Sequence, residues 1–403
     1  MDSKALKTTR SAFLWTRLLS TPFFVLFTLL PYILYRDVGA SLLQVTTIII
    51  LKPAVSLIAP YWSVSIIKRP DRLKANLAWA NLLKYTPFLF IPWFDSVGYF
   101  TFASMIYLIL GRGVIPAWME ILKLNIPGHS RTHVFAYGQA FDYLGIALFP
   151  LGFAWILDAY EDSWRWLFFM TALIGILSTW FLSRIPPSET LHQESPSSLK
   201  ETVLKPWKVS WDLLSQRRDF ARFQYGFMLG GAGLMVIHAA LPIFFNDTLN
   251  LSYKEMTLAT SFCKGIGFAM ATPFWAKLFQ RIHIFRFCSW VTLLAAIFPV
   301  LLYLSILDIR FLWAAYLAYG IMQGGSELSW HLSGPVFSPD SDSSIYSQTN
   351  ILAQGVRGVV MPYLGFFLTT GFGASWALLA AILFCLLATK IMSKAPEKSI
   401  VGT

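Results

Sequence analysis

The stretch KPAVSLIAPYW, from Lys52 to Trp62, decides the fold of this chain because a variant of it occurs again further along. The second copy, KGIGFAMATPFW, runs from Lys264 to Trp275. Both copies place a lysine inside an apolar run that ends in proline, an aromatic residue and tryptophan. Trp275 lies 213 positions after Trp62, which is close to half of the 403 residues. The repetition predicts a chain built from two related halves.

The composition predicts that most of the chain lies in lipid. Hydrophobic residues make up 56% of the chain and charged residues only 13%, against about 25% charged residues in an ordinary soluble domain. The mean hydropathy is +0.57. A soluble domain could not bury that much apolar surface, so we expect a membrane protein. The three cysteines lie in apolar runs without the spacing of metal ligands, and we interpret them as small core residues.

The formal net charge of +11 follows from the predicted topology. Most of the 32 lysines and arginines fall in segments on one side of the predicted membrane. This is the positive-inside bias of multi-pass membrane proteins. We therefore expect a lipid bilayer as the surrounding partner and no nucleic acid.

Twelve apolar runs are long enough to cross the membrane, since a helix needs about 20 residues at a rise of 1.5 Å each. They cover about 11–35, 41–67, 76–94, 97–122, 133–157, 164–184, 222–245, 255–279, 284–306, 310–333, 346–369 and 374–393. We predict an all-α membrane protein with twelve transmembrane helices arranged as two pseudo-symmetric six-helix bundles.

One long polar segment separates the first six runs from the last six. We predict an N-terminal six-helix bundle at 1–184, a cytoplasmic linker at 185–221 and a C-terminal six-helix bundle at 222–403. An even number of spans with basic ends places both termini in the cytoplasm.

The repeat stays in register beyond the opening pair, at offsets of 209 to 213 positions. The matched residues are Leu30-Pro31 with Leu241-Pro242, Gly111 with Gly320, Tyr137 with Tyr346, Pro150 with Pro362, and Ser163-Trp164 with Ser375-Trp376. Six spans in each repeat mean that both halves enter the membrane in the same sense. Parallel repeats of this kind occur in secondary transporters.

Several local patterns also occur in a known family. Ser163-Trp164-Arg165-Trp166 resembles the Trp-Arg-Trp opening of the sixth helix of the major facilitator superfamily, and Gly111-Arg112-Gly113 resembles the arginine motif of its fourth helix. Gly145 with Pro150-Leu151-Gly152 is similar to the motif of its fifth helix. The 6 + linker + 6 layout extends the resemblance over nearly the whole chain, without assigning a substrate branch.

The chain departs from the family in the loop after the second helix, where the superfamily carries Gly-x-x-x-Asp-Arg. Ser63, Ile67 and Lys68 stand at those positions, so the glycine and the aspartate on which the usual gating salt bridge depends are lost. Two interpretations of Asp71 and Arg72 stay open: they substitute for that gate, or they form a solvated turn.

No enzyme signature is found, whether a zinc-binding His-Glu-x-x-His, a phosphate loop or a nucleophile elbow. We expect no enzymatic activity, no cofactor and no metal.

Charges within the predicted spans are the candidates for function, since each is costly in lipid and normally faces a partner or a water-filled cavity. Lys52, Lys264 and Arg357 lie about 14–17 Å from the start of their helices, near the middle of the membrane. Lys52 and Lys264 either pair with neighbouring helices or hold an anion between the halves. The repeat favours the anion. Lys84 lies on a helix that is of the outer type in the family, so we do not include it among the candidate functional residues.

Two further pairs leave alternatives open. Arg112 with Asp142, and Arg357 with Glu327, form either structural ion pairs or pairs that substrate or protons break. A buried acid can titrate near neutrality, so Asp142 and Glu327 are the candidates for proton coupling, with His331 as a relay or as a hydrogen-bonded helix residue.

These observations predict a secondary transporter of the bacterial inner membrane that moves a small organic anion by alternating access. Lys52, Lys264, Arg112 and Arg357 are the predicted substrate-binding residues. We expect coupling to protons, in symport or antiport, and a monomer. Two alternatives remain: an efflux carrier for drugs or other amphipathic compounds, suggested by the 16% aromatic content, and a non-transporting membrane sensor or scaffold.

Overall fold

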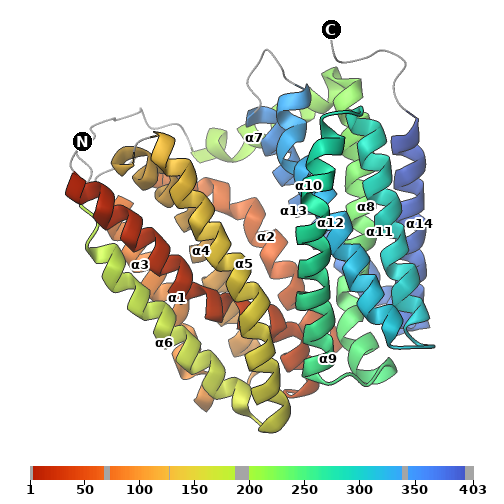
Figure 1. Ribbon diagram of the computed structural model, residues 1–403, viewed down its shortest axis with the longest axis horizontal. Coiled ribbons are helices and arrows are strands. Elements are labelled where there is room, and N and C mark those ends of the chain that lie inside the picture. The colour runs from red at the N-terminus through yellow and green to blue at the C-terminus, as the bar shows by residue number, and fades with distance from the viewer. Residues whose placement is uncertain (1–2, 68–72, 127, 187–198, 338–343, 395–403) are drawn as a thin grey trace. The chain divides into compact units, whose positions relative to one another are not determined.

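The computed structural model describes residues 3–67, 73–126, 128–186, 199–337 and 344–394, and every regular element in these ranges is helical. The chain divides into two compact units, Met1–Ser197 and Ser198–Thr403. Figure 1 shows the helices of both units. The prediction of an all-α protein is confirmed.

The first unit contains six long helices and a short 3₁₀ segment among the described residues. These are α1 (Ser3–Arg36), α2 (Leu42–Ile67), α3 (Leu73–Tyr85), η2 (Thr86–Trp93), α4 (Val97–Asn125), α5 (Gly128–Ala159) and α6 (Ser163–Ser183). The predicted third span is thus divided into an α-helix and a 3₁₀-helix. The division falls at Pro87, whose missing N–H cannot continue the α-helical hydrogen bonds.

The described part of the second unit begins with a helix that the span analysis did not predict. Its elements are α7 (Leu199–Gln216), α8 (Arg218–Ile243), η3 (Phe244–Thr248), α9 (Tyr253–Thr257), η4 (Leu258–Cys263), α10 (Lys264–Phe279), α11 (Ile284–Leu304), α12 (Arg310–Phe337), α13 (Ser344–Phe372) and α14 (Ala374–Ser393). The predicted eighth span, 255–279, is built from α9, a π-helical segment and α10. The first of its two lysines, Lys264, follows directly on the π-helical turn.

Six helices among the described residues are both long and apolar enough to cross a membrane by length and composition. They are α1, α6, the α8–η3 segment, α11, most of α13 and α14. Shorter apolar stretches occur in α2, α4 and α5. The stretches in α2 and α4 include Lys52 and Arg112.

The core of the first unit is a cluster of aromatic rings. Phe23 of α1 lies edge-on to Tyr85 and Phe88, with ring centroids 5.0 and 4.7 Å apart, and also contacts Tyr107 of α4. A Cβ at Gly175 of α6 would lie only 2.7 Å from the Tyr85 ring. Gly175 is therefore the residue that lets α3 pack closely against α6.

A buried amide also joins α3 to α6. Asn81 is 1% exposed and donates from Nδ2 to Ser178 Oγ at 2.8 Å and to Thr179 Oγ1 at 2.9 Å. Interhelical hydrogen bonds of this kind contribute about 0.6 kcal/mol each in membranes. They fix the rotation of α3, and with it the direction in which Lys84, three residues further on, can point.

In the second unit α10 and α12 approach each other through glycines. A Cβ at Gly320 would overlap the backbone carbonyl of Lys264, and one at Gly267 would overlap that of Leu317. Trp275 Nε1 donates to the backbone carbonyl of Ile321 at 2.7 Å on the same interface. Small residues let membrane helices pack at short distance, so the repeated stretch around Lys264 is held firmly on α12.

Arg217, just before α8, joins three segments at one end of the second unit. Its guanidinium bonds both carboxylate oxygens of Asp219, at 3.1 and 2.8 Å, and donates to the Tyr346 hydroxyl at 3.1 Å and to the Phe337 carbonyl at 3.2 Å. The hydrogen bonds to Asp219 raise the pKa of Arg217 above its ordinary value. The end of α12 and the start of α13 are thereby fixed to the start of α8.

Candidate functional site

The first unit contains a cavity of about 490 Å³. This volume is in the range of small-molecule sites in proteins. Four charged side chains line the cavity: Arg17 of α1, Lys52 of α2, Lys84 of α3 and Arg112 of α4. Each of the first four helices thus contributes one cation.

The cavity is short of compensating negative charge. Among the described residues that line it there is no aspartate or glutamate. In the part of the chain that the structure describes, no carboxylate oxygen lies within 4.0 Å of Lys52, Lys84 or Arg112. Lys52 and Arg112 are both exposed although they lie within membrane helices. Both line the cavity, and a charge within a membrane helix normally faces a partner or a water-filled space.

Aromatic rings compensate part of this charge. The Lys84 ammonium lies 4.6 Å from the centroid of the Tyr85 ring, and the Arg17 guanidinium lies 5.2 Å from that of Phe13. Such contacts contribute about 0.5–2 kcal/mol. Each contribution is smaller than that of a full counter-ion.

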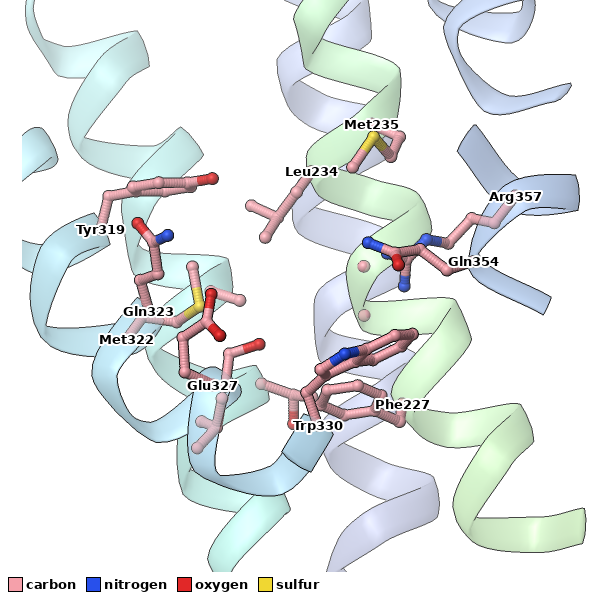
Figure 2. A pocket seen from close by; sticks show the side chains of 16 residues that line it. Phe227, Leu234, Met235, Tyr319, Met322, Gln323, Glu327, Trp330, Gln354 and Arg357 are labelled. Carbon is pink, nitrogen blue, oxygen red and sulfur yellow. The ribbon is translucent and has the colours of Figure 1, made fainter. Parts of the chain in front are cut away.

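The second unit contains its own cavity, of about 230 Å³, lined by α8, α11, α12 and α13. Figure 2 shows Glu327, Gln323 and Tyr319 on one wall and Arg357 with Gln354 on the opposite wall. Arg357 and Glu327 therefore face each other across the cavity instead of pairing directly. The Trp330 and Phe227 rings, 6.4 Å apart and nearly parallel, close one end.

Arg357 occupies a space that a glycine provides. A Cβ at Gly231 of α8 would overlap its guanidinium, and its Nη1 lies 3.6 Å from the Met228 sulfur. The Nε atom is buried without a hydrogen-bond partner among the described residues. A buried guanidinium with a weak sulfur acceptor and an unused donor has capacity left for a ligand.

Lys264 is adjacent to this second cavity but does not line it, because the ring of Tyr319 lies between them. Its ammonium lies 5.0 Å from the centroid of the Tyr319 ring, and Tyr319 lines the cavity. Lys52 and Lys264, equivalent in the repeat, therefore lie at the cavities of their own units. Lys52 lines its cavity directly, whereas Lys264 lies behind an aromatic side chain.

Some predicted site residues cannot be placed. Asp142 lies in α5 and His331 in α12, but their side chains are outside the described part of the structure, as are Asp71 and Arg72 altogether. The proposed Arg112–Asp142 pair, the proton relay and the gate stay predictions.

The structure adds Lys84 and Arg17, which the sequence analysis did not select. Lys84 was set aside because the third helix is peripheral in the resembling family, yet it lines the cavity beside Asn81 and Tyr85. Its position in an apolar run was the signal that could have identified it.

Comparison with known proteins identifies the family. A profile of the Major Facilitator Superfamily matches residues 12–355. The chain belongs to the Major Facilitator Superfamily. No curated protein sequence matches it.

Solved structures of similar fold are those of transporters. A POT family transporter in complex with 5-aminolevulinic acid has a TM-score of 0.74 at 12% identity, covering 97% of this chain and 96% of that one. The nucleoside transporter NupG has a TM-score of 0.72 at 12% identity, covering 96% and 99%. A D-xylose-proton symporter has a TM-score of 0.67 at 17% identity, covering 96% and 97%. At these identities the likeness concerns the fold.

Membership of the Major Facilitator Superfamily confirms the predicted twelve-helix fold and the predicted family. It makes this chain a multi-pass membrane transporter of small-molecule solutes. The superfamily transports solutes of many classes, so the solute must be inferred from the two cavities.

Proposed function

We propose that the chain is a secondary active transporter that moves a small organic anion by alternating access. The observation that carries the proposal is the cavity of the first unit, lined by Lys52, Lys84 and Arg112 with no carboxylate within 4.0 Å among the described residues. Cations in a medium of low dielectric attract an anion far more strongly than they would in water. An anionic solute also offsets the repulsion between them.

Proton coupling is part of the proposal and is assigned to the second unit. Glu327 lines its cavity opposite Arg357. A carboxylate that faces a cation across a cavity is sensitive to the charge of what enters between them. In this scheme a proton on Glu327 removes the negative charge that faces Arg357 and so favours an anion between them, and Asp142 and His331 are further groups that carry the proton.

We also propose that the protein is a monomer in the bacterial inner membrane with both termini in the cytoplasm. The predicted linker, 185–221, lies on that side. These placements rest on the positive-inside pattern of the sequence.

A second function is favoured by one observation. The stacked rings of Trp330 and Phe227 give the second cavity one apolar end. This lining suits an amphipathic compound, and the alternative is efflux of such compounds. Growth of a pump-deleted host on amphipathic drugs, with and without the carrier, separates the two functions: anion transport alone gives no resistance.

The test of anion transport is uptake into proteoliposomes from a panel of organic anions and neutral analogues of equal size. We expect uptake of anions only, and at least a tenfold loss in Lys52→Gln. Lys74→Gln, in α3 but outside the cavity lining, is the control and should keep wild-type uptake. Equal uptake of neutral and anionic solutes, by wild type and by the Lys52→Ala/Lys264→Ala double variant, would overturn the proposal.

A further inference from the structure

Helix α7 (Leu199–Gln216) has an apolar surface that the second unit covers only in part. Leu213 and Leu214 pack against the core of that unit. Gln348 of α13 donates from Nε2 to the Pro206 carbonyl at 3.2 Å, which holds the middle of α7 against α13. One side of α7 is therefore fixed to the protein.

An apolar stripe beside this contact remains exposed. Leu204, Trp207 and Trp211 form the stripe; they are three and four residues apart and so lie along one face of the helix. Trp211 is 72% exposed and Leu204 is 54% exposed, and Trp207 is exposed as well. Large apolar side chains gathered on one face of an otherwise polar helix are typical of contact with a partner or with a membrane surface.

Helix α7 ends directly beside a membrane-spanning segment. Only Arg217 separates it from the α8–η3 segment, which is long and apolar enough to cross a membrane. The hydrogen bonds of Arg217 to Asp219 and to Tyr346 fix this corner. Figure 1 shows α7 running at a large angle to α8. A helix that leaves a spanning segment in this way lies near the membrane surface, at the level of the lipid head groups.

Basic residues accompany the apolar stripe. Lys205, Lys208 and Arg218 are exposed, and Asp212 is the one acidic residue in the described segment 204–218. Among the described residues neither lysine has a carboxylate oxygen within 4.0 Å. A lysine can lay its apolar stem along a membrane surface while its ammonium stays among the head groups. Anionic lipids attract such basic residues.

We propose that α7 is an interfacial helix that places the apolar stripe in the head-group boundary of the bilayer and binds anionic phospholipid through Lys205 and Lys208. The bilayer is the occupant that fits, because tryptophan is enriched at membrane interfaces and the positive charge complements anionic head groups. The surface lies outside both cavities, so the inference does not depend on which solute is transported.

Quenching by lipid tests where the apolar stripe lies. Trp211→Cys and the control Gln216→Cys, each with Cys263→Ser, are labelled with a nitrobenzoxadiazole dye, and the full-length protein is placed in phosphatidylcholine–phosphatidylglycerol nanodiscs. Gln216 is exposed on the same helix but lies outside the stripe. We expect doxyl-labelled lipid to quench the dye at position 211 at least about twofold more than at 216. Equal quenching, as for a stripe that faces water, the first unit or a soluble partner, would overturn the proposal.

Lipid binding to the full-length protein in detergent, measured by native mass spectrometry, tests the role of the lysines. We expect tighter binding of phosphatidylglycerol than of phosphatidylcholine with the same acyl chains. Lys205→Gln/Lys208→Gln should weaken phosphatidylglycerol at least about threefold and leave phosphatidylcholine unchanged. Lys277→Gln/Lys394→Gln removes the same charge from exposed positions of the same unit and is the matched control. The proposal is wrong if the two lipids bind equally, or if both double variants weaken phosphatidylglycerol to the same extent.

Discussion

At the scale of single residues, the molecule handles its buried charges in two ways. The first unit groups like charges around one cavity, where Lys52 and Arg112 remain exposed. The second unit places opposite charges on facing walls, with Arg357 against Gly231 and Glu327 across from it. A charge within a membrane helix is costly by about 2.5–3.5 kcal/mol even on the lenient insertion scale. The five cations that line these cavities, with Lys264 beside the second, are therefore costly enough to need a function.

Gly231 leaves the space that the Arg357 guanidinium occupies, and substituting it tests this packing. Gly231→Ala adds a methyl group that overlaps the guanidinium, so we expect the arginine to move and the protein to lose about 1–3 kcal/mol of stability by overpacking. Melting temperature in detergent measures the change. Gly265→Ala is the control, because a Cβ there meets no atom within 4 Å. Its stability should stay within about 0.5 kcal/mol of wild type. Equal melting of the two variants would contradict the role assigned to Gly231.

At the scale of elements, the π-helical segment Leu258–Cys263 and the glycine contact between α10 and α12 together orient Lys264. A π-helical turn holds more residues than an α-helical one and so changes which face of the following helix a side chain occupies. In the structure this face is the one against Tyr319. The repeat-equivalent Lys52 lies in a continuous α-helix. This difference accounts for the direct exposure of Lys52 to the cavity of the first unit.

The two repeats supply a matched pair of variants for the α10–α12 contact. In Gly320→Ala the new Cβ would overlap the backbone carbonyl of Lys264, which no side-chain rotation can relieve. We expect a loss of about 3 kcal/mol or more and poor recovery of folded protein. Gly111→Ala, at the equivalent position of the first repeat, meets no atom within 4 Å and should melt within about 0.5 kcal/mol of wild type. Size-exclusion chromatography measures the recovery of folded protein for both variants, and thermal melts measure their stability. If both variants tolerate alanine equally, the close contact does not stabilise the second unit.

The helices could be predicted from sequence because lipid leaves few alternatives to an apolar helix of about 20 residues. The division of the third span at Pro87 and the π-helical turn before Lys264 could not, since both depend on packing. Helix α7 was missed because it is amphipathic: Leu213 and Leu214 pack on the core of the second unit, while Trp211 is 72% exposed.

The site was predicted in part. The cost of burying charge singled out Lys52, Arg112, Lys264 and Arg357, and each lies at or beside a cavity. The cost of burial does not say which charges share a cavity, because that depends on how helices distant in sequence are rotated. Lys84 was set aside because its helix is of the outer type in the family, and the sequence does not show that the hydrogen bonds of Asn81 to α6 set its direction.

At the scale of the whole molecule, the described residues that line each cavity all belong to one unit. All described residues that line the first cavity precede residue 150, and all that line the second follow residue 220. We therefore expect binding at the first cavity to depend mainly on the first unit.

Cleaving the chain tests this expectation. A protease site inserted between residues 187 and 198 allows the purified protein to be cut at the boundary of the two units. We expect anion affinity, measured by calorimetry before and after cleavage, to change less than twofold, because no residue lining the first cavity is removed. Uncut protein with the same insertion is the control. Loss of binding on cleavage would show that the first cavity depends on the second unit.

The three cysteines provide a means of observing Lys264 directly. Cys288 and Cys385 are buried, and their thiols donate to Ser329 Oγ and to the Gly230 carbonyl, whereas Cys263 is partly exposed and immediately precedes Lys264. A maleimide reagent should therefore modify the native protein at Cys263 alone. Mass spectrometry can follow the rate of that labelling in the protein without any engineered substitution. The rate reports on changes in the surroundings of Lys264, the residue that matches Lys52 in the first repeat.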